Sequence, residues 1–328
     1  MLPEYFNFLL TGAFQNEYTN ATSTNLVNAY SKSWDMELIG GLGLPKRIFG
    51  PLATPGTSPG HFTEAVKEMV GFDCEVLLPA THDTGSAFLA VPARDDNAVY
   101  ISSGTWSLLG VENDEPITTE RSRLQNFTNE GGYRYRFRYL KNIMSLWMIQ
   151  SIRRELNGVA YVIGKNGPQH EGEKKIGFDE LEAAARAAEY FESTGDVNDG
   201  SFLAPESMAE AVKNYCRQTC QTVPPSMGEL MQCVYRSLAT CYAKSISELS
   251  RLTGRHYTSI NIVGGGAKDD YLNELTARAT GLPVFAGPTE GTALGNLMVQ
   301  MIANGEYPDL AAARKAVRHS FTVKEITA

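Results

Sequence analysis

The sequence contains no apolar run near the roughly 20 residues that a membrane-spanning helix needs, so no membrane partner is expected. Its first residues, Met1 to Tyr5, lack the basic segment and the apolar stretch of a secretory signal. Basic residues are also in deficit, with 29 Lys and Arg against 37 Asp and Glu and a net charge of −8. Binding to nucleic-acid phosphates relies on clustered Lys and Arg. The sequence therefore predicts a cytoplasmic protein with no nucleic-acid partner.

Cysteine is scarce, and no two cysteines have the C-x-x-C spacing of zinc or redox sites. The five cysteines are Cys74, Cys216, Cys220, Cys233 and Cys241. Cys216 and Cys220 are four residues apart and could face each other on a helix, which permits a disulfide or a weak metal site. Reduced thiols in a cytosolic protein are the simpler interpretation. We predict no metal site from this pattern.

Two common nucleotide-binding motifs are also missing. No Walker sequence G-x-x-x-x-G-K-[ST] occurs, and the run Gly264-Gly265-Gly266 does not continue into G-x-G-x-x-G, because Asp269 stands where the third glycine belongs. Three glycines between a strand and a helix could let a flat ring or a phosphate lie against bare backbone. A purely structural tight turn remains the alternative for these three residues.

The order of the expected elements predicts an α/β fold. The length of the chain, 328 residues, suits two domains. A polar loop at 92–97 is the expected boundary between domains 1–94 and 95–328. The basic and aromatic residues 133–139 alternate with period two, which predicts an exposed strand. Strands alternating with helices indicate parallel pairing. We expect strands at 75–78, 98–101, 106–111, 256–263 and 283–286, and helices from 81, at 179–192, 226–253, 269–280 and 291–304.

Asp83 is the first candidate for chemistry, since it lies where a strand gives way to a helix. Its carboxylate could cap the helix by accepting a bond from a free amide. It could instead be a general base for a hydroxyl nucleophile, and a weak base suffices in phosphoryl transfer. His82 and Thr84 flank it with groups suited to holding a polyol. The tripeptide alone does not decide between these interpretations.

Two further patterns could contact a ligand. The turn Ser102-Ser103-Gly104-Thr105 joins two expected strands, and its glycine, amides and Thr105 hydroxyl suit a phosphate. A hairpin turn that satisfies only its own backbone is the alternative. Asn142 and Gln150 lie eight residues apart, slightly over two helical turns, so both could face one cleft. On spacing alone they are more often surface amides.

Taken in order, these segments resemble the FGGY carbohydrate kinases, a family with the actin-like ATPase (ribonuclease H-like) fold. The resemblance covers nearly the whole chain, and within the family it is nearest to the kinases of L-rhamnulose. It implies ATP-dependent phosphorylation of that sugar, with ATP and Mg²⁺ as cofactors. The stretches that carry it are 3–6 with 10–12, 17–22, 82–84, 102–108, 128–132, 140–144, 262–266 and 286–290.

The resemblance also implies individual roles. Asp83 resembles the proton acceptor that activates the sugar hydroxyl. His82, Thr84 and Asn142 resemble substrate contacts. The residues that resemble nucleotide contacts are Thr105, Gln150 and Gly265, with Gly264 and Gly266 completing the loop.

One feature of the family is not found here. Its first phosphate loop, with an Asp-x-Gly core that helps to hold Mg²⁺ and the ATP phosphates, would precede Pro3-Glu4-Tyr5-Phe6, and no such core occurs near the start. The resemblance therefore predicts an incomplete first domain, weak nucleotide binding with little turnover, and self-association through uncovered sheet surface. The alternatives to an L-rhamnulose kinase are a non-catalytic nucleotide-binding fragment of such an enzyme, or a kinase for another sugar such as fuculose or xylulose.

Overall fold

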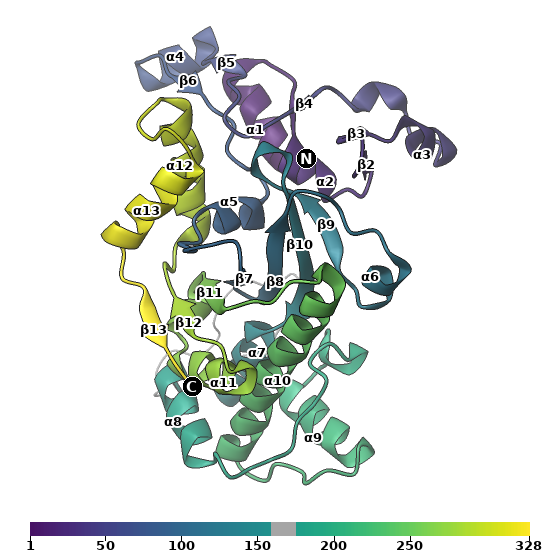
Figure 1. Cartoon of the computed structure of the whole chain (residues 1–328), viewed down its shortest axis with the longest axis vertical. Coiled ribbons are helices and arrows are strands. Elements are labelled where there is room, and N and C mark those ends of the chain that lie inside the picture. The colour runs from purple at the N-terminus through teal and green to yellow at the C-terminus, as the bar shows by residue number, and fades with distance from the viewer. Residues whose placement is uncertain (159–174) are drawn as a thin grey trace.

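A computed structural model describes residues 1–158 and 175–328, and a mixed sheet lies at its centre (Figure 1). The strand order is β13-β12-β11-β7-β8-β10-β9. Strands β7, β11 and β12 pair in parallel, and the other neighbours in this sheet are antiparallel. The bounds are Ala98–Ser103 (β7), Trp106–Asn113 (β8), Thr128–Gly131 (β9), Phe137–Met144 (β10), Ser259–Val263 (β11), Val284–Ala286 (β12) and Lys324–Ile326 (β13).

Helices cover both faces of this sheet. Successive side chains of a strand point to opposite sides, and apolar side chains on both sides need to be buried. Val99 and Ile101 of β7 join the large core that lies against one group of helices, whereas Ala98 and Tyr100 pack with Phe88 on the other side. The first group is α7 (Leu146–Leu156), α8 (Phe178–Ala187), α9 (Met208–Gln218), α10 (Met227–Thr253) and α11 (Asp270–Thr280). The second is α5 (Asp83–Leu89), α12 (Gly291–Ala303) and α13 (Leu310–Ser320) (Figure 1).

The long helix α10 has clear signals at both ends. Ser226 and Glu229 form a capping box, in which each side chain meets the other residue's backbone amide. Gly254 follows the last turn with φ 69°, a left-handed conformation that glycine adopts at little cost. Both ends agree with the helix expected at 226–253.

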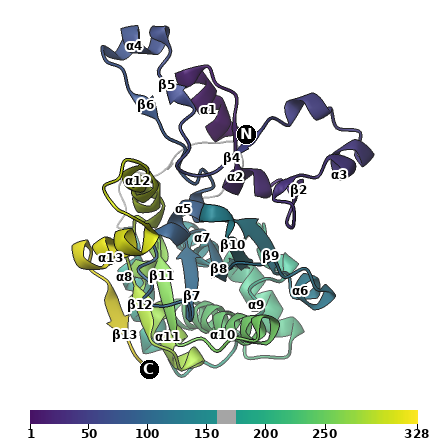
Figure 2. The same cartoon turned by 45° about the horizontal axis from the view of Figure 1, so that its top comes forward.

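Residues 1–82 form short elements that extend away from the sheet on two sides (Figure 2). Three pairs of two-residue strands hold this segment: β1 with β4, β2 with β3, and β5 with β6. The bounds are α1 Leu2–Thr11, β1 Asn16–Glu17, α2 Tyr18–Thr22, β2 Val27–Asn28, β3 Ser33–Trp34, α3 Met36–Gly41, η1 Lys46–Ile48, β4 Leu52–Ala53, β5 Gly60–His61, α4 Glu64–Val70 and β6 Glu75–Val76.

The helix α12 packs closely on α5, and glycines make this approach feasible. A Cβ on Gly295 would come within 3.0 Å of three backbone atoms of Ser86, its carbonyl oxygen among them. A Cβ on Gly291 would come within 3.3 Å of the Val263 side chain. The hydroxyl of Thr292 donates to the Asp83 carbonyl oxygen at 3.3 Å. The start of α5 is therefore fixed by a helix that lies more than 200 residues further along the chain.

Several expected elements are present with shifted ends, and one expectation is wrong. The strand at 75–78 is shorter (β6), the strand at 256–263 begins at Ser259, and the helix at 179–192 ends at Ala187. Residues 133–139 do not form an exposed strand, because Tyr133–Tyr135 is a 3-10 turn (η2) and Phe137 to Leu140 are buried in β10. The remaining elements are α6 (Glu120–Leu124), η3 (Gly200–Phe202) and η4 (Gly265–Lys268). No helix in 1–158 or 175–328 is long and apolar enough to cross a membrane.

Candidate active site

A cleft of about 1190 Å³ opens beside the sheet and collects several of the residues singled out above. It contains His82, Asp83 and Thr84 from the start of α5, and Thr105 from the β7–β8 turn. Asn142 of β10 lies in the same cleft. The helix α10 and the loop before η3 contribute a further part of the wall, with Asp196, Asn198, Asp199, Ser237, Thr240, Lys244 and Glu248.

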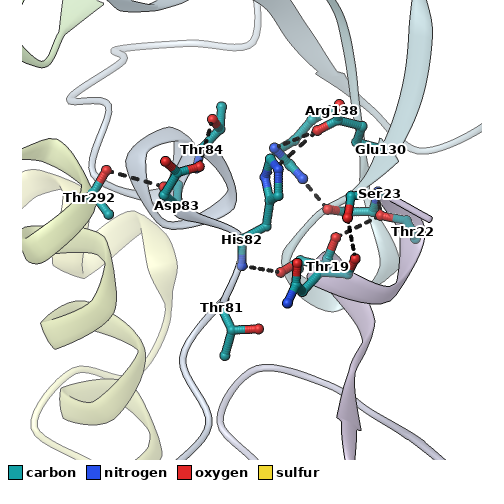
Figure 3. A network of polar contacts seen from close by, with 12 residues as sticks. Thr19, Thr22, Ser23, Thr81, His82, Asp83, Thr84, Glu130, Arg138 and Thr292 are labelled. Carbon is teal, nitrogen blue, oxygen red and sulfur yellow. Dashed lines mark hydrogen bonds and ion pairs between the residues drawn. The ribbon is translucent and has the colours of Figure 1, made fainter. Parts of the chain in front are cut away.

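Asp83 lies exposed in this cleft as the first residue of α5 (Figure 3). The N-cap position belongs to His82, which makes no side-chain capping bond. The Asp83 carboxylate accepts from the amide of its neighbour Thr84 at 2.6 Å and from the Thr84 hydroxyl at 3.2 Å. The structural alternative, in which Asp83 is the N-cap, is therefore wrong. Its carboxylate remains accessible to a ligand.

A buried carboxylate, Glu17, fixes the backbone that leads into α5. It accepts hydrogen bonds from the amide and the hydroxyl of Thr81, both at 3.0 Å, and from the amide of Thr19 at 2.8 Å. The hydroxyl of Thr19 in turn accepts from the amide of His82 at 3.4 Å. Burial raises the pKa of Glu17, while these bonds lower it. The sequence motif at 17–22 gives no sign of this role, because Thr81, the partner at the start of α5, lies 64 residues away.

The β7–β8 turn is held against the glycine run by close backbone packing. A Cβ on Gly266 would come within 2.5 Å of the Ser103 side chain, and one on Gly264 would lie 2.7 Å from the Ser103 carbonyl oxygen. Gly265 differs, because a Cβ there would meet nothing within 4 Å. Gly264 and Gly266 are therefore needed for packing, which agrees with the structural alternative for these two, whereas the exposed Gly265 is free to face a ligand.

A chain of hydroxyl groups anchors the same turn to the helices. Ser107 donates to Ser103 at 3.2 Å and lies 2.7 Å from the hydroxyl of Tyr242 in α10. The same Tyr242 hydroxyl is 2.8 Å from the hydroxyl of Ser145, just before α7. Desolvation raises the pKa of Tyr242 to about 12, so the phenol stays neutral. The tip of the turn, with Thr105, is thereby held at the cleft.

Gln150 and the glycine run do not lie in this cleft. Asn142 is on β10, where it pairs with Leu108 of β8, and Gln150 is on α7, so the helical spacing assumed for the two amides was wrong. Among the described residues that line the cleft, neither Gln150 nor Gly264 to Gly266 is found. The structure therefore brings together the expected sugar contacts and Thr105, but not the other expected nucleotide contacts.

The cleft also contains an ion pair that the sequence did not indicate. The ammonium of Lys141 donates to Glu248 of α10 at 2.7 Å, and it lies 5.2 Å from the centre of the Phe127 ring. Both charged side chains are largely buried. Lys141 directly precedes Asn142 in the sequence, but its partner is more than 100 residues away. Sequence reasoning could not have joined the two.

Asp269, directly after the glycine turn, gives the site a pH-dependent stability. It caps α11 by accepting from the Leu272 amide at 3.0 Å, and the Tyr235 hydroxyl donates to it at 3.1 Å. Burial raises its pKa from 3.8 to about 6. Between these two pH values the folded state binds more protons than the unfolded state, so this contribution to stability is lost as pH rises.

We expect Asp269→Asn to remove that dependence. Relative to this variant, the unchanged chain should lose about 2 kcal/mol of unfolding free energy between pH 4 and pH 6, since each unit of pKa shift corresponds to about 1.4 kcal/mol and part of the loss falls outside this range. Urea unfolding of both proteins across this range measures the difference. Curves that run parallel with pH would show that Asp269 does not titrate in this way.

Comparison with known proteins identifies the family. Residues 99–304 match the C-terminal domain of the FGGY family of carbohydrate kinases, and residues 1–90 match its N-terminal domain. The chain belongs to the FGGY family of carbohydrate kinases. It is 46% identical over 325 residues to a rhamnulokinase of Oceanobacillus iheyensis, covering 98% of this chain and 64% of that protein. A Bacillus subtilis rhamnulokinase is 40% identical over 330 residues, covering 100% of this chain and 64% of that protein. The chain thus spans a little under two thirds of these relatives.

Solved structures show the same fold at low sequence identity. A ligand-bound xylulose kinase from Lactobacillus acidophilus has a TM-score of 0.72 at 17% identity, over 99% of this chain and 62% of that one. A Plasmodium falciparum glycerol kinase with ADP has a TM-score of 0.72 at 12% identity, over 98% and 61%. The mixed α/β, two-domain fold of FGGY kinases expected from the sequence is confirmed. The boundary at 94/95 stays a prediction.

Proposed function

We propose that this chain carries out, as a rhamnulokinase does, the ATP-dependent phosphorylation of L-rhamnulose at its 1-hydroxyl. The observation that carries the proposal is the 46% identity to a rhamnulokinase over 98% of the chain. The accessible carboxylate of Asp83 in the cleft supports it from the structure. Residues His82, Thr84 and Asn142, which line the same cleft, are proposed to hold the sugar.

In the proposed reaction, Asp83 accepts the proton of the sugar 1-hydroxyl. The hydroxyl oxygen attacks the γ-phosphorus of ATP, the bond from that phosphorus to the β–γ bridging oxygen breaks, ADP leaves, and the hydroxyl proton passes to Asp83 as the new bond is completed. Proton transfer comes late in such a reaction, so a weak carboxylate base suffices. Thr105, at the exposed tip of the β7–β8 turn, is proposed to contact the nucleotide phosphates, and Gly265 the rest of the nucleotide. For Gln150, the proposal of a nucleotide contact rests on the family resemblance alone.

Magnesium is proposed to arrive with the nucleotide, as part of the substrate Mg-ATP. Within 1–158 and 175–328 no three His, Cys, Asp or Glu side chains are grouped so that they could hold a metal ion. The described residues thus offer no group of three such ligands that would hold a metal ion by protein side chains alone. This agrees with the usual behaviour of Mg²⁺, which binds through substrate phosphates, water and one or two carboxylates.

A coupled assay of ADP release tests the proposed function. The chain is incubated with Mg-ATP and L-rhamnulose, with L-fuculose and D-xylulose as competing substrates. Turnover that is fastest with L-rhamnulose supports the proposal, and turnover that is fastest with another sugar replaces the substrate. Nucleotide binding without turnover would indicate a binding module, the second possibility raised by the sequence. Neither binding nor turnover would overturn both.

We expect Gly265→Val to weaken ATP binding while sugar binding is kept. A Cβ at this position meets no protein atom within 4 Å, so the fold should tolerate it, and any loss would come from contact with the ligand. Calorimetric titration with ATP and with L-rhamnulose measures both affinities. Unchanged ATP affinity in a folded Gly265→Val protein would exclude this glycine from the nucleotide site.

A further inference from the structure

A fully buried guanidinium, Arg138, lies close to the start of α5 (Figure 3). Its side chain is 1% exposed. Its Nε donates to the carbonyl oxygen of Gly131 at 3.0 Å, and its Nη1 lies 3.0 Å from an oxygen of Glu130. The contact of Nη1 with Glu130 is an ion pair that lacks hydrogen-bond geometry, and Nη2 has no hydrogen-bond partner among residues 1–158 and 175–328. Taking a guanidinium out of water costs several kcal/mol unless it is well paired, so a buried arginine in this state calls for a reason.

The sheet itself places Glu130 beside Arg138. The two residues are direct partners in the antiparallel register of β9 and β10, so their side chains share one face of the sheet. The following glycines hold the backbone close. A Cβ on Gly131 would lie 2.5 Å from the ring of Tyr18, and one on Gly132 would lie 2.8 Å from the Arg136 carbonyl oxygen. The hairpin that carries the pair is therefore packed closely on Tyr18 of α2.

A third residue, His82, lies beside Glu130 and Arg138. It lines the cleft, and 21% of its side chain is exposed. Its Nδ1 is buried, has no hydrogen-bond partner in the described part of the chain, and lies 3.8 Å from an oxygen of Glu130. The charged groups that face it are Arg138 from β10, Glu130 from β9 and Asp83 from α5. Burial and Arg138 lower the pKa of His82, while Glu130 and Asp83 raise it, and lowering prevails. His82 is therefore neutral near pH 7, with a proton on one ring nitrogen.

We propose that Glu130 and Arg138 are positioning residues for His82. They determine which ring nitrogen carries the proton, and therefore which one acts as an acceptor toward the cleft. Glu130 keeps the proton on Nδ1, because a carboxylate favours the N–H that points toward it. Nε2 is then an acceptor, and it receives a hydrogen bond from a sugar hydroxyl. Arg138 neutralises Glu130, so that this carboxylate does not draw a second proton onto the ring. The part concerning the sugar rests on the proposed function.

The charge arrangement predicts opposite effects of two substitutions on the His82 ring, which proton NMR titration measures. Glu130→Gln removes an anion that raises the pKa of His82, so that pKa should fall. Arg138→Met removes a cation that lowers it, so that pKa should rise. Arg138→Lys keeps the charge and should leave the pKa near its original value. The chain has five histidines, and the signal of His82 is assigned by its loss in His82→Asn.

A matched control is available elsewhere in the chain. Glu274 also pairs with a guanidinium, that of Arg186, through two hydrogen bonds at 2.6 and 3.0 Å. Glu274→Gln should leave the His82 titration unchanged. If Glu130→Gln and Arg138→Met move the pKa of His82 no more than this control does, the proposal is wrong. Should Arg138→Met not fold, Glu130→Gln and Arg138→Lys still decide the matter.

Sugar binding gives a second measurement. Glu130→Gln should weaken L-rhamnulose binding about fivefold to tenfold, the range expected for one hydrogen bond, and should leave ATP binding unchanged. Equal losses for both ligands would indicate a merely structural role and would contradict the proposal. The NMR titration requires neither sugar nor turnover. If the chain binds no L-rhamnulose at all, the proposed function fails while the assignment of Glu130 and Arg138 is still decided by the titration.

Discussion

Replacing Asp83 with Asn is expected to lower kcat about 10²–10⁴-fold, the usual contribution of a positioned general base. The amide cannot accept the proton of the sugar hydroxyl, yet it has nearly the size and shape of the carboxylate. The carboxylate is exposed in the cleft, and within 1–158 and 175–328 it accepts hydrogen bonds only from Thr84. Folding should therefore be little changed. The affinities for sugar and nucleotide should fall far less than kcat.

The coupled ADP assay and calorimetric titration of L-rhamnulose separate these effects. Asp309→Asn is a suitable control, because Asp309 caps α13 by accepting from the Ala312 amide at 2.8 Å and does not line the cleft. Asparagine caps a helix about as well as aspartate, so kcat should stay the same in the control. Near-normal kcat in Asp83→Asn would remove Asp83 from the reaction and leave the cleft without an assigned base.

Replacing Gly295 with Ala is expected to cause the largest loss of stability among the changes considered. The added methyl group would overlap the backbone of Ser86, and backbone atoms cannot move aside as a flexible side chain can. The helices α5 and α12 would have to separate, which opens the packing of Met298 and Val299 on Ala90 and Leu89. Overpacking a tight core typically costs about 1–3 kcal/mol and sometimes more. The upper end of this range is expected here.

Urea unfolding gives the stability change, and the kinase assay gives its consequence for Asp83. Gly41→Ala is the matched control, because Gly41 also lies in a helix, α3, and a Cβ there meets nothing within 4 Å. That control should be neutral or slightly stabilising, since alanine favours a helix by up to about 1 kcal/mol over glycine. Equal stability of the two variants would show that α5 and α12 can part without cost.

The fold could largely be predicted from the sequence, because its signals are local. Period-two and helical patterns, the capping residues of α10 and the glycines at turns are all read from neighbouring residues. The wrong expectation at 133–139 has a physical cause. Arg138 alternates with aromatic residues as a surface strand would, yet its charge is buried opposite Glu130. Composition cannot show that a charged residue has a partner on another strand.

The candidate site was only partly accessible to such reasoning. His82, Asp83 and Thr84 were found because they are consecutive and stand at the start of a helix. Glu17 and Glu248 were missed, since each acts through a partner that lies far along the chain. Gln150 was linked to Asn142 by a helical spacing, although a strand ends and a helix begins between them. Contacts of this kind depend on tertiary structure, which residue spacing does not contain.

The packing of α12 on α5 also constrains how the chain is made. Asp83 and Thr292, which meet at this contact, are separated by 209 residues. At about 5–20 residues per second, a ribosome needs about 10–40 s to pass from one to the other. During that interval the face of α5 that carries Leu89 and Ala90 lacks α12, whose Val299 and Met298 pack against these two residues. The segment that bears the proposed base thus reaches its final environment only after α12 has been made, and nascent chains that stop before α12 leave this apolar face open to chaperones and proteases.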